Sequence, residues 1–265
     1  MTHAGHNLAL SDLRRRILAL DHSARASRPA LSFGVEAMDR HLPWGGLPLG
    51  TLHECVEGGM ESEHAAAATL FTAGILARMR GTVLWCLRGH DLFAPALASV
   101  GLGPDRVIYV ETWRDAEVLP AMEEGLRHGG LAGVVGEVAR LGLTASRRLQ
   151  LAAEGSGVPA FVLRRWRNDA ERASGSEPSA VFTRWRISPA SSRAPPAPGL
   201  GRARWRVELL RCRGAEATSW VLEACDAEGR LALPALLPDQ PHPQEVRPRP
   251  KAPLAVEPPG RRSVA

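Results

Sequence analysis

The stretch that decides the fold runs from Gly45 to Leu70 and reads GGLPLGTLHECVEGGMESEHAAAATL. A turn-forming GGLPLG leads into a short apolar run, Leu52–Val56, which we predict to be a strand. A glycine-containing loop and an alanine-rich helical segment follow it. This order of strand, loop and helix is the frame of a phosphate-binding loop, in which backbone N–H groups and a lysine hold the phosphates of a nucleotide.

The loop lacks the side chains that this chemistry needs. The pattern G-x-x-x-x-G-K-[ST] is absent, and the one lysine of the chain is Lys251, near its C-terminal end. The loop carries Glu57, Glu61 and Glu63 instead, and their negative charge repels phosphate. We therefore predict that this loop does not hydrolyse ATP and that the protein holds no cofactor and no metal.

Composition sets broad limits on the function. The chain has 265 residues and a net charge of +5, which is mildly basic and favours nucleic acid or acidic partners only weakly. Its four cysteines form no C-x-x-C pair, which is typical of buried thiols in a reducing compartment. Because we find no signal peptide and no apolar run of membrane-spanning length, we expect a cytoplasmic, soluble protein without membrane contact.

Three regions are predicted along the chain. Residues 1–28 form an N-terminal helix, with helically spaced leucines and isoleucine between Leu8 and Leu20, and a linker. Residues 29–237 form the core domain. Residues 238–265 are rich in proline and arginine and poor in apolar residues, so we expect a disordered tail.

Strands alternate with helices in the first part of the core. This pattern is typical of an α/β fold with a mostly parallel sheet flanked by helices. The predicted strands are Leu52–Val56, Thr82–Leu87, Arg106–Val110, Gly133–Val138 and Val158–Leu163, and the predicted helices are Ala65–Arg80, Leu92–Val100, Ala116–His128 and Thr144–Glu154.

The pattern changes after about Arg167. Residues 168–179 are polar and read as a loop, and no further helix is predicted. Strand-like runs follow, and we expect them to form an antiparallel C-terminal extension at the edge of the sheet. The runs are Ala180–Ile187, Arg204–Cys212 and Ser219–Ala224, with a last short piece at Leu231–Leu237.

The order of these pieces resembles a RecA-like core. The segment LSFGVEAMD (31–39) is similar to the opening of such cores, and GGLPLGTLHE (45–54) is similar to their approach to the phosphate loop. Within this superfamily the chain most resembles the ImuA family, RecA-like and SulA-related accessory proteins of bacterial damage-induced mutagenesis. The segments that carry this resemblance are GGLPLGTLHE (45–54), GEVARLGLTASRRLQLAAEGSGVPAFVLR (136–164), TRWRI (183–187) and RWRVELLRCRG (204–214).

The resemblance implies a function in the SOS response, as an accessory protein of translesion synthesis and DNA repair. It implies an ImuB-like inactive Y-family polymerase as a partner and, through it, an error-prone C-family polymerase. Contact with RecA itself is a further expectation, since RecA-like protomers associate edge to edge.

The chain departs from the RecA-type ATPases at two of three catalytic elements. The loop 57–64 has no lysine and no threonine, and Gly89 stands about where those ATPases place a catalytic glutamate. An acid is kept in the strand that binds the metal, at Glu137. The residues of the degenerate nucleotide loop are Gly58, Gly59, Glu61, Ser62, Glu63 and His64.

Each of these remnants has two interpretations. The loop could touch a nucleotide through its glycine amides, or its acids could simply cap the following helix. Glu137 could hold Mg²⁺, or it could form an ion pair with Arg140 or with an arginine of the Arg147–Arg148 pair.

Three Arg-Trp-Arg units recur, at 165–167, 184–186 and 204–206. Alternation along a strand puts the tryptophan on one face and the arginines on the other, so the arginines either lie in solvent or contact DNA or a protein. The polar loop 168–179 lies where RecA-like proteins contact DNA, but it contains three acids and no aromatic residue. The candidate contact residues are Arg184, Arg186, Arg204, Arg206, Arg211 and Arg213.

Two classes of function remain open. The first is a non-catalytic RecA-like scaffold that acts by protein–protein contact. The alternative is a DNA-stimulated RecA-class ATPase, or a DNA-binding repair protein, with a degenerate nucleotide loop.

Overall fold

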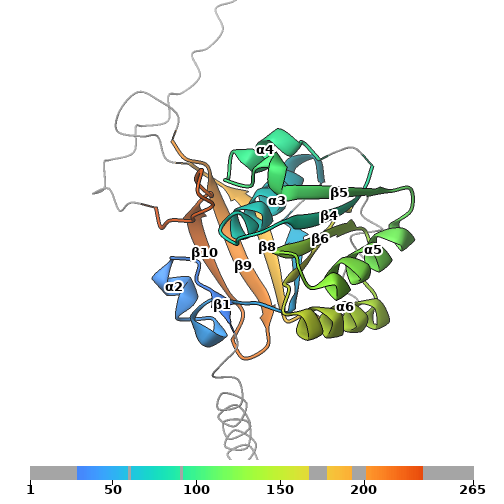
Figure 1. The fold of residues 1–265 in the computed structure, drawn as a ribbon. Coiled ribbons are helices and arrows are strands. Elements are labelled where there is room, and N and C mark those ends of the chain that lie inside the picture. The colour runs from blue at the N-terminus through green and yellow to red at the C-terminus, as the bar shows by residue number, and fades with distance from the viewer. Residues whose placement is uncertain (1–28, 59–60, 90–91, 167–177, 193–200, 235–265) are drawn as a thin grey trace, which may run out of the picture. The chain divides into compact units, whose positions relative to one another are not determined.

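An eight-stranded sheet forms the centre of the protein (Figure 1). The computed structural model describes residues 29–58, 61–89, 92–166, 178–192 and 201–234. The strand order is β10-β9-β8-β3-β7-β6-β4-β5. The strands are β3 (Leu52–Glu57), β4 (Val83–Arg88), β5 (Val107–Thr112), β6 (Gly133–Val138), β7 (Ala160–Arg164), β8 (Thr183–Ala190), β9 (Arg204–Cys212) and β10 (Thr218–Glu223).

The sheet is mostly parallel, as predicted. β3 lies between β7 and β8 and is parallel to both, while β9 and β10 extend the sheet in antiparallel fashion. β8 joins the two parts of the sheet, because it is parallel to β3 on one side and antiparallel to β9 on the other. The connection between Arg164 and Thr183 is long enough for the chain to return to the starting end of the sheet, whereas β8, β9 and β10 follow one another as an antiparallel meander.

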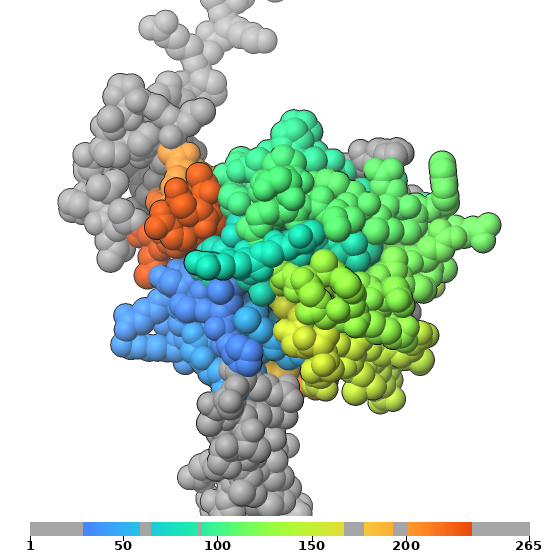
Figure 2. Space-filling model, viewed as in Figure 1, coloured from blue at the N-terminus to red at the C-terminus, as the bar shows by residue number. Residues whose placement is uncertain are grey.

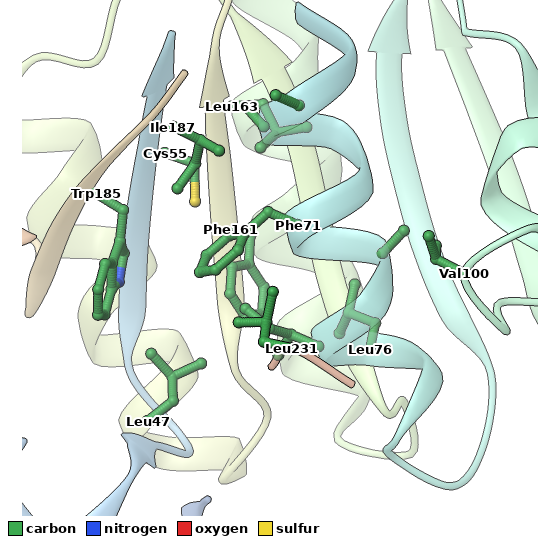
Figure 3. Close-up of a cluster of buried hydrophobic side chains, with 14 of the residues drawn as sticks. Leu47, Cys55, Phe71, Leu76, Val100, Phe161, Leu163, Trp185, Ile187 and Leu231 are labelled. Carbon is green, nitrogen blue, oxygen red and sulfur yellow. The ribbon is translucent and has the colours of Figure 1, made fainter. Parts of the chain in front are cut away.

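Helices cover both faces of the sheet. Alternate residues of each strand point to opposite faces. On one face α3 (Glu61–Ala77) packs on a cluster that contains Phe161 and in which Phe71 contacts Trp185 (Figure 3). On the other face α5 (Asp115–His128) and α6 (Leu143–Ser156) lie side by side (Figure 1) and bury a second cluster.

The two ends of α5 follow from its sequence. Acidic residues Asp115 and Glu117 lie in the first turn of α5, and Arg127 and His128 lie in its last turn, so the charges complement the helix dipole. Gly129 ends α5 with φ 69°, a left-handed conformation that favours glycine.

The N-terminal part of the core packs against the C-terminal strands (Figure 2). The ring of His41 lies 5.7 Å from that of Trp220, and its Nε2 is 2.7 Å from the carbonyl oxygen of Glu216. The short elements of this N-terminal region are β1 (Ala30–Leu31), paired with β2 (Leu47–Pro48), α2 (Glu36–Asp39) and η1 (Pro43–Gly45). Two further short helices, α4 (Ala94–Ala98) and η2 (Pro104–Arg106), lie between β4 and β5 along the chain.

Two predicted elements differ from the structure. The helix predicted at Leu92–Val100 is only five residues long, Ala94–Ala98, with Pro95 in its first turn and Gly101, which has φ 88°, three residues beyond its end. Of the segment predicted at Leu231–Leu237 the structure describes residues 231–234, and these contribute a single bridge, between Ala232 and Glu223. The predicted N-terminal helix and the predicted tail lie outside the described residues.

Candidate functional site

The candidate nucleotide loop begins at Gly58, directly after β3. The N–H of Gly58 donates to the carbonyl of Ile187 at 3.1 Å, so it continues the ladder between β3 and β8. A Cβ at Gly58 would lie 2.4 Å from the Cβ of Ser188, which is closer than real contacts allow. Packing between the two strands therefore explains this glycine without a ligand, and its N–H already has an acceptor.

The rest of the loop is only partly described. Helix α3 begins at Glu61, but Gly59 and the side chains of Glu61, Ser62, Glu63 and His64 lie outside the described part of the structure. Helix capping by these acids thus stays a prediction.

Arg165 joins the candidate loop strand to the candidate metal strand. It directly follows β7, and its Nη1 donates to Oε1 of Glu57, at the end of β3, at 2.7 Å. Its Nε donates to Oε2 of Glu137, on β6, at 2.8 Å. The guanidinium thus lies at the carboxyl ends of three neighbouring parallel strands, where open α/β sheets bind ligands.

The same guanidinium also contacts the first turns of α3. Nη1 donates to the carbonyl of Ala65 at 3.2 Å, and Nη2 donates to Oγ1 of Thr69 at 2.7 Å. Arg165 is therefore a fixed cation between the candidate loop strand, the helix that follows the loop, and Glu137. We call Arg165, Glu57, Glu137 and Thr69 the Arg165 network.

The Arg165 network is buried. The side chain of Arg165 is 12% exposed, that of Glu57 is 0% exposed and that of Glu137 is 13% exposed. Burial alone lowers the pKa of the Arg165 guanidinium, but the charges and hydrogen bonds of Glu137 and Glu57 outweigh it, so the net shift is upward. Arg165 is thus a permanent positive charge held by two carboxylates.

Glu137 has partners on both carboxylate oxygens. Oε1 accepts a hydrogen bond from Nε1 of Trp85 at 2.8 Å, and Oε2 accepts from Arg165. The ion-pair interpretation of this acid holds in the structure, but the partner is Arg165 and not Arg140 or the Arg147–Arg148 pair. A search of the described residues finds no group of three His, Cys, Asp or Glu side chains that could share a metal ion.

Gly89 follows β4 with φ 89°. A residue with a side chain rarely adopts this conformation. The backbone at Gly89 therefore favours glycine over the glutamate that the resemblance would place here. Asp91, the other acid near this position, is not among the described residues.

A second buried network lies on the other face of the sheet. Arg164, 1% exposed, donates through Nη1 to Oε1 of Glu54 at 2.8 Å. Arg184 donates through Nε to Oε2 of the same carboxylate at 2.6 Å, and Ser179 lies 3.4 Å from that oxygen. We call Arg164, Glu54, Arg184 and Ser179 the Glu54 network. Arg184, predicted as a contact residue, thus bonds inside the protein.

The other five predicted contact arginines fall into two groups. Arg186 makes a two-pronged ion pair with Glu208, at 2.7 and 2.9 Å. Arg211 donates to the carbonyl of Ser179 at 3.0 Å, and Arg213 donates to the carbonyl of Ala180 at 2.5 Å. Arg204 and Arg206 make no hydrogen bond or ion pair with any described residue, so the structure separates these two from the rest.

The tryptophans of the Arg-Trp-Arg units belong to the interior. Trp185 is 0% exposed and Trp205 is 5% exposed, and both lie in the cluster beneath α3. Trp166 is also buried, and the guanidinium carbon of Arg164 lies 5.6 Å from its ring centre. None of the three offers a ring for stacking on a base.

Four charged residues of the two networks were missed as site residues: Glu54, Glu57, Arg164 and Arg165. The signal was present in the sequence. Glu54 and Glu57 interrupt the run that forms β3, and the two arginines end the apolar run that forms β7. Charges inside strands that are buried on both faces need partners of opposite sign, and acids on one such strand with arginines on another predict ion pairs between them.

One histidine, His53, lies in the core of the protein. It is buried on β3, where Nδ1 lies 2.8 Å from Oγ1 of Thr183 and Nε2 lies 2.9 Å from the carbonyl oxygen of Pro48. Burial lowers the pKa of His53 to about 4, against a smaller opposite effect of the hydrogen bond to Pro48. His53 is therefore a neutral core residue near pH 7.

Among the described residues, no helix is both long and apolar enough to cross a bilayer.

Comparison with known proteins gives one clear relationship. Two relatives, each called "Protein ImuA", come from Caulobacter vibrioides strains NA1000 / CB15N and ATCC 19089 / CIP 103742 / CB 15. Each is 43% identical to this chain over 217 residues, which cover 78% of this chain and 88% of the relative. No family model matches the chain.

Proposed function

The chain belongs to the ImuA family, and we propose that it is a non-catalytic accessory protein of damage-induced translesion synthesis that acts by binding other proteins. Membership of the ImuA family supports a role in damage-induced mutagenesis, and the contacts of the Arg165 network support a non-catalytic role. We therefore also propose that the protein is not an ATPase.

The position of Arg165 carries the proposal. A nucleotide at this edge of the sheet needs a free cation for its phosphates and a free acid for its Mg²⁺. Here Arg165, a cation at this edge, is bound by Glu57 and Glu137, and both oxygens of Glu137 already have donors. A triphosphate would have to displace a buried ion pair and approach two carboxylates, and both changes oppose binding.

The partners that we propose follow from the resemblance. They are an ImuB-like inactive Y-family polymerase and, through it, an error-prone C-family polymerase, with RecA as a further candidate. The four cysteines are free thiols, in keeping with action in the reducing cytoplasm. A pull-down of the ImuB-like polymerase by the full chain and by versions without residues 1–28 or 238–265 tests whether the ends or the core bind it.

Nucleotide titration tests the non-catalytic role. Fluorescent ATP with Mg²⁺ is titrated into the full-length protein and into Glu137→Ala, and we expect no saturable binding to either protein up to about millimolar ATP. Micromolar affinity in the wild type that Glu137→Ala abolishes would refute the proposal.

The alternative, a DNA-stimulated ATPase with an unusual loop, predicts a different result. Steady-state phosphate release would rise when single-stranded DNA is added and would be lost in Glu137→Ala. We expect no release above the background of a mock preparation in either condition. The same preparation serves for both assays, so the two functions are separated directly.

A further inference from the structure

The outer face of β8, β9 and β10 is the side that points away from α3. On the inner side of these strands Trp185, Trp205 and Leu222 are buried. Pairing of the strands arranges the outer side chains in three rows. We define the outer face by these rows: Arg186, Glu208 and Ser219; Ser188, Arg206 and Val221; Ala190, Arg204 and Glu223.

Two arginines of this face, Arg204 and Arg206, make no hydrogen bond or ion pair with a described residue. Arg186 forms an ion pair with Glu208, and Arg202 lies 3.3 Å from a carboxylate oxygen of Glu223. The hydrogen bond from Arg186 lowers the pKa of Glu208, and the nearby charge of Arg206 lowers it further. With Arg202 included, the arginines of the face outnumber its acids, so a net positive charge of two remains.

The surroundings of these two arginines are open and partly apolar. Arg206 is exposed, and Val221 beside it is 40% exposed. Ser188 and Ala190 on the neighbouring strand are short, so they do not rise above the sheet. Arg204 and Arg206 are two residues apart on β9, which separates their positions by about 7 Å.

We propose that the outer face binds an extended acidic segment of a protein partner. Two carboxylates at alternate positions of that segment pair with Arg204 and Arg206, because an extended chain repeats its side chains at the same spacing of about 7 Å. An apolar side chain of the segment packs on Val221. This inference rests on the proposed function, which it deepens by naming the surface and the chemistry of the partner.

The composition of the face favours a protein over a nucleic acid. Arg186 and Arg202 already bind the acids of the face, which leaves Arg204 and Arg206 without a close partner, whereas a phosphate backbone binds through a larger number of such cations. The buried tryptophans of these strands point to the inner side, so they cannot stack on bases. A carboxylate segment can place its charges at the two arginines alone.

Fluorescence anisotropy with the full-length protein tests the proposal. The probes are fluorescein-labelled Thr-Glu-Val-Glu-Thr with blocked ends, the same peptide with glutamine in place of glutamate, and a single-stranded oligothymidine. The test variant is Arg204→Glu/Arg206→Glu. The matched control is Arg140→Glu/Arg147→Glu, which changes the net charge equally at two exposed arginines that also lack partners among the described residues.

We expect the glutamate peptide to bind, the test variant to weaken it at least about tenfold, and the control variant to change it by less than about twofold. The glutamine peptide should bind no variant. Thermal unfolding of both variants should match the wild type, since the mutated side chains are on the surface.

Three results would overturn the proposal: no binding of the glutamate peptide at about millimolar protein, equal losses in test and control variants, or binding of oligothymidine that the test variant alone abolishes. Failure of the proposed function is seen separately, because nucleotide binding at the Arg165 network leaves the peptide result unchanged.

Discussion

Replacing Arg165 by methionine is the most direct test of the buried network. Methionine keeps much of the volume of the arginine stem but removes the guanidinium. Glu57, with a side chain that is 0% exposed, then loses its bond to the cation, while Glu137 keeps the hydrogen bond from Trp85. Removal of one partner from a buried pair costs about 3–5 kcal/mol. We expect a loss of this size in the free energy of unfolding.

Urea unfolding followed by tryptophan fluorescence measures this loss. A typical domain has about 5–15 kcal/mol of stability, so Arg165→Met should lower the midpoint strongly at an unchanged slope.

The triple variant Arg165→Met/Glu57→Gln/Glu137→Gln is the control for packing. It removes the cation and both acids together, so no buried charge is left without a partner, and we expect it to recover most of the lost stability. A loss below about 1 kcal/mol in Arg165→Met would mean that water already solvates the pair as at a surface, and the reasoning would fail. Failure of the triple variant to recover stability would assign the loss to packing.

Three further predictions concern stability. Between pH 6.5 and 4 the unfolded chain binds a proton at His53 and the folded protein does not. As the pH is lowered over this range, the free energy of unfolding should therefore decrease by about 3 kcal/mol, and urea unfolding of His53→Gln should not show this decrease. Gly89→Ala should destabilise by about 1–2 kcal/mol because φ is 89°, while Gly155→Ala, in open space on α6, should stabilise in the same assay. Arg106 donates to the carbonyls of Leu76 and Ala77 at the end of α3 and of Gly81 beyond it. Calorimetry of Arg106→Ala should therefore show a loss of about 1.5–3 kcal/mol in the free energy of unfolding, whereas the exposed Arg80→Ala should show no such loss. An unchanged pH profile, a neutral Gly89→Ala or equal melting of the two arginine variants would contradict them in turn.

The sequence predicted the fold better than the site, for a physical reason. Strand and helix positions follow from the local periodicity of apolar residues, so β6 was predicted with the observed bounds of Gly133–Val138. Strand direction depends on long connections, so local periodicity did not predict that β8 pairs in parallel with β3. The partner of Glu137 depends on which strands become neighbours: Arg140 is near in sequence, but β7 lies beside β6 and brings Arg165 to it.

Consecutive arginines at the end of β7 explain how one strand serves both faces of the sheet. Arg164 and Arg165 point to opposite sides, and each meets an acid of the neighbouring β3, Glu54 on one side and Glu57 on the other. A slip of one residue between β3 and β7 would move each arginine to the wrong face, away from its acid. The two networks therefore fix the register of these strands even where they add little net stability. An arginine that holds this register cannot also be a free cation for a phosphate, which links the packing of the core to the absence of nucleotide chemistry that we propose.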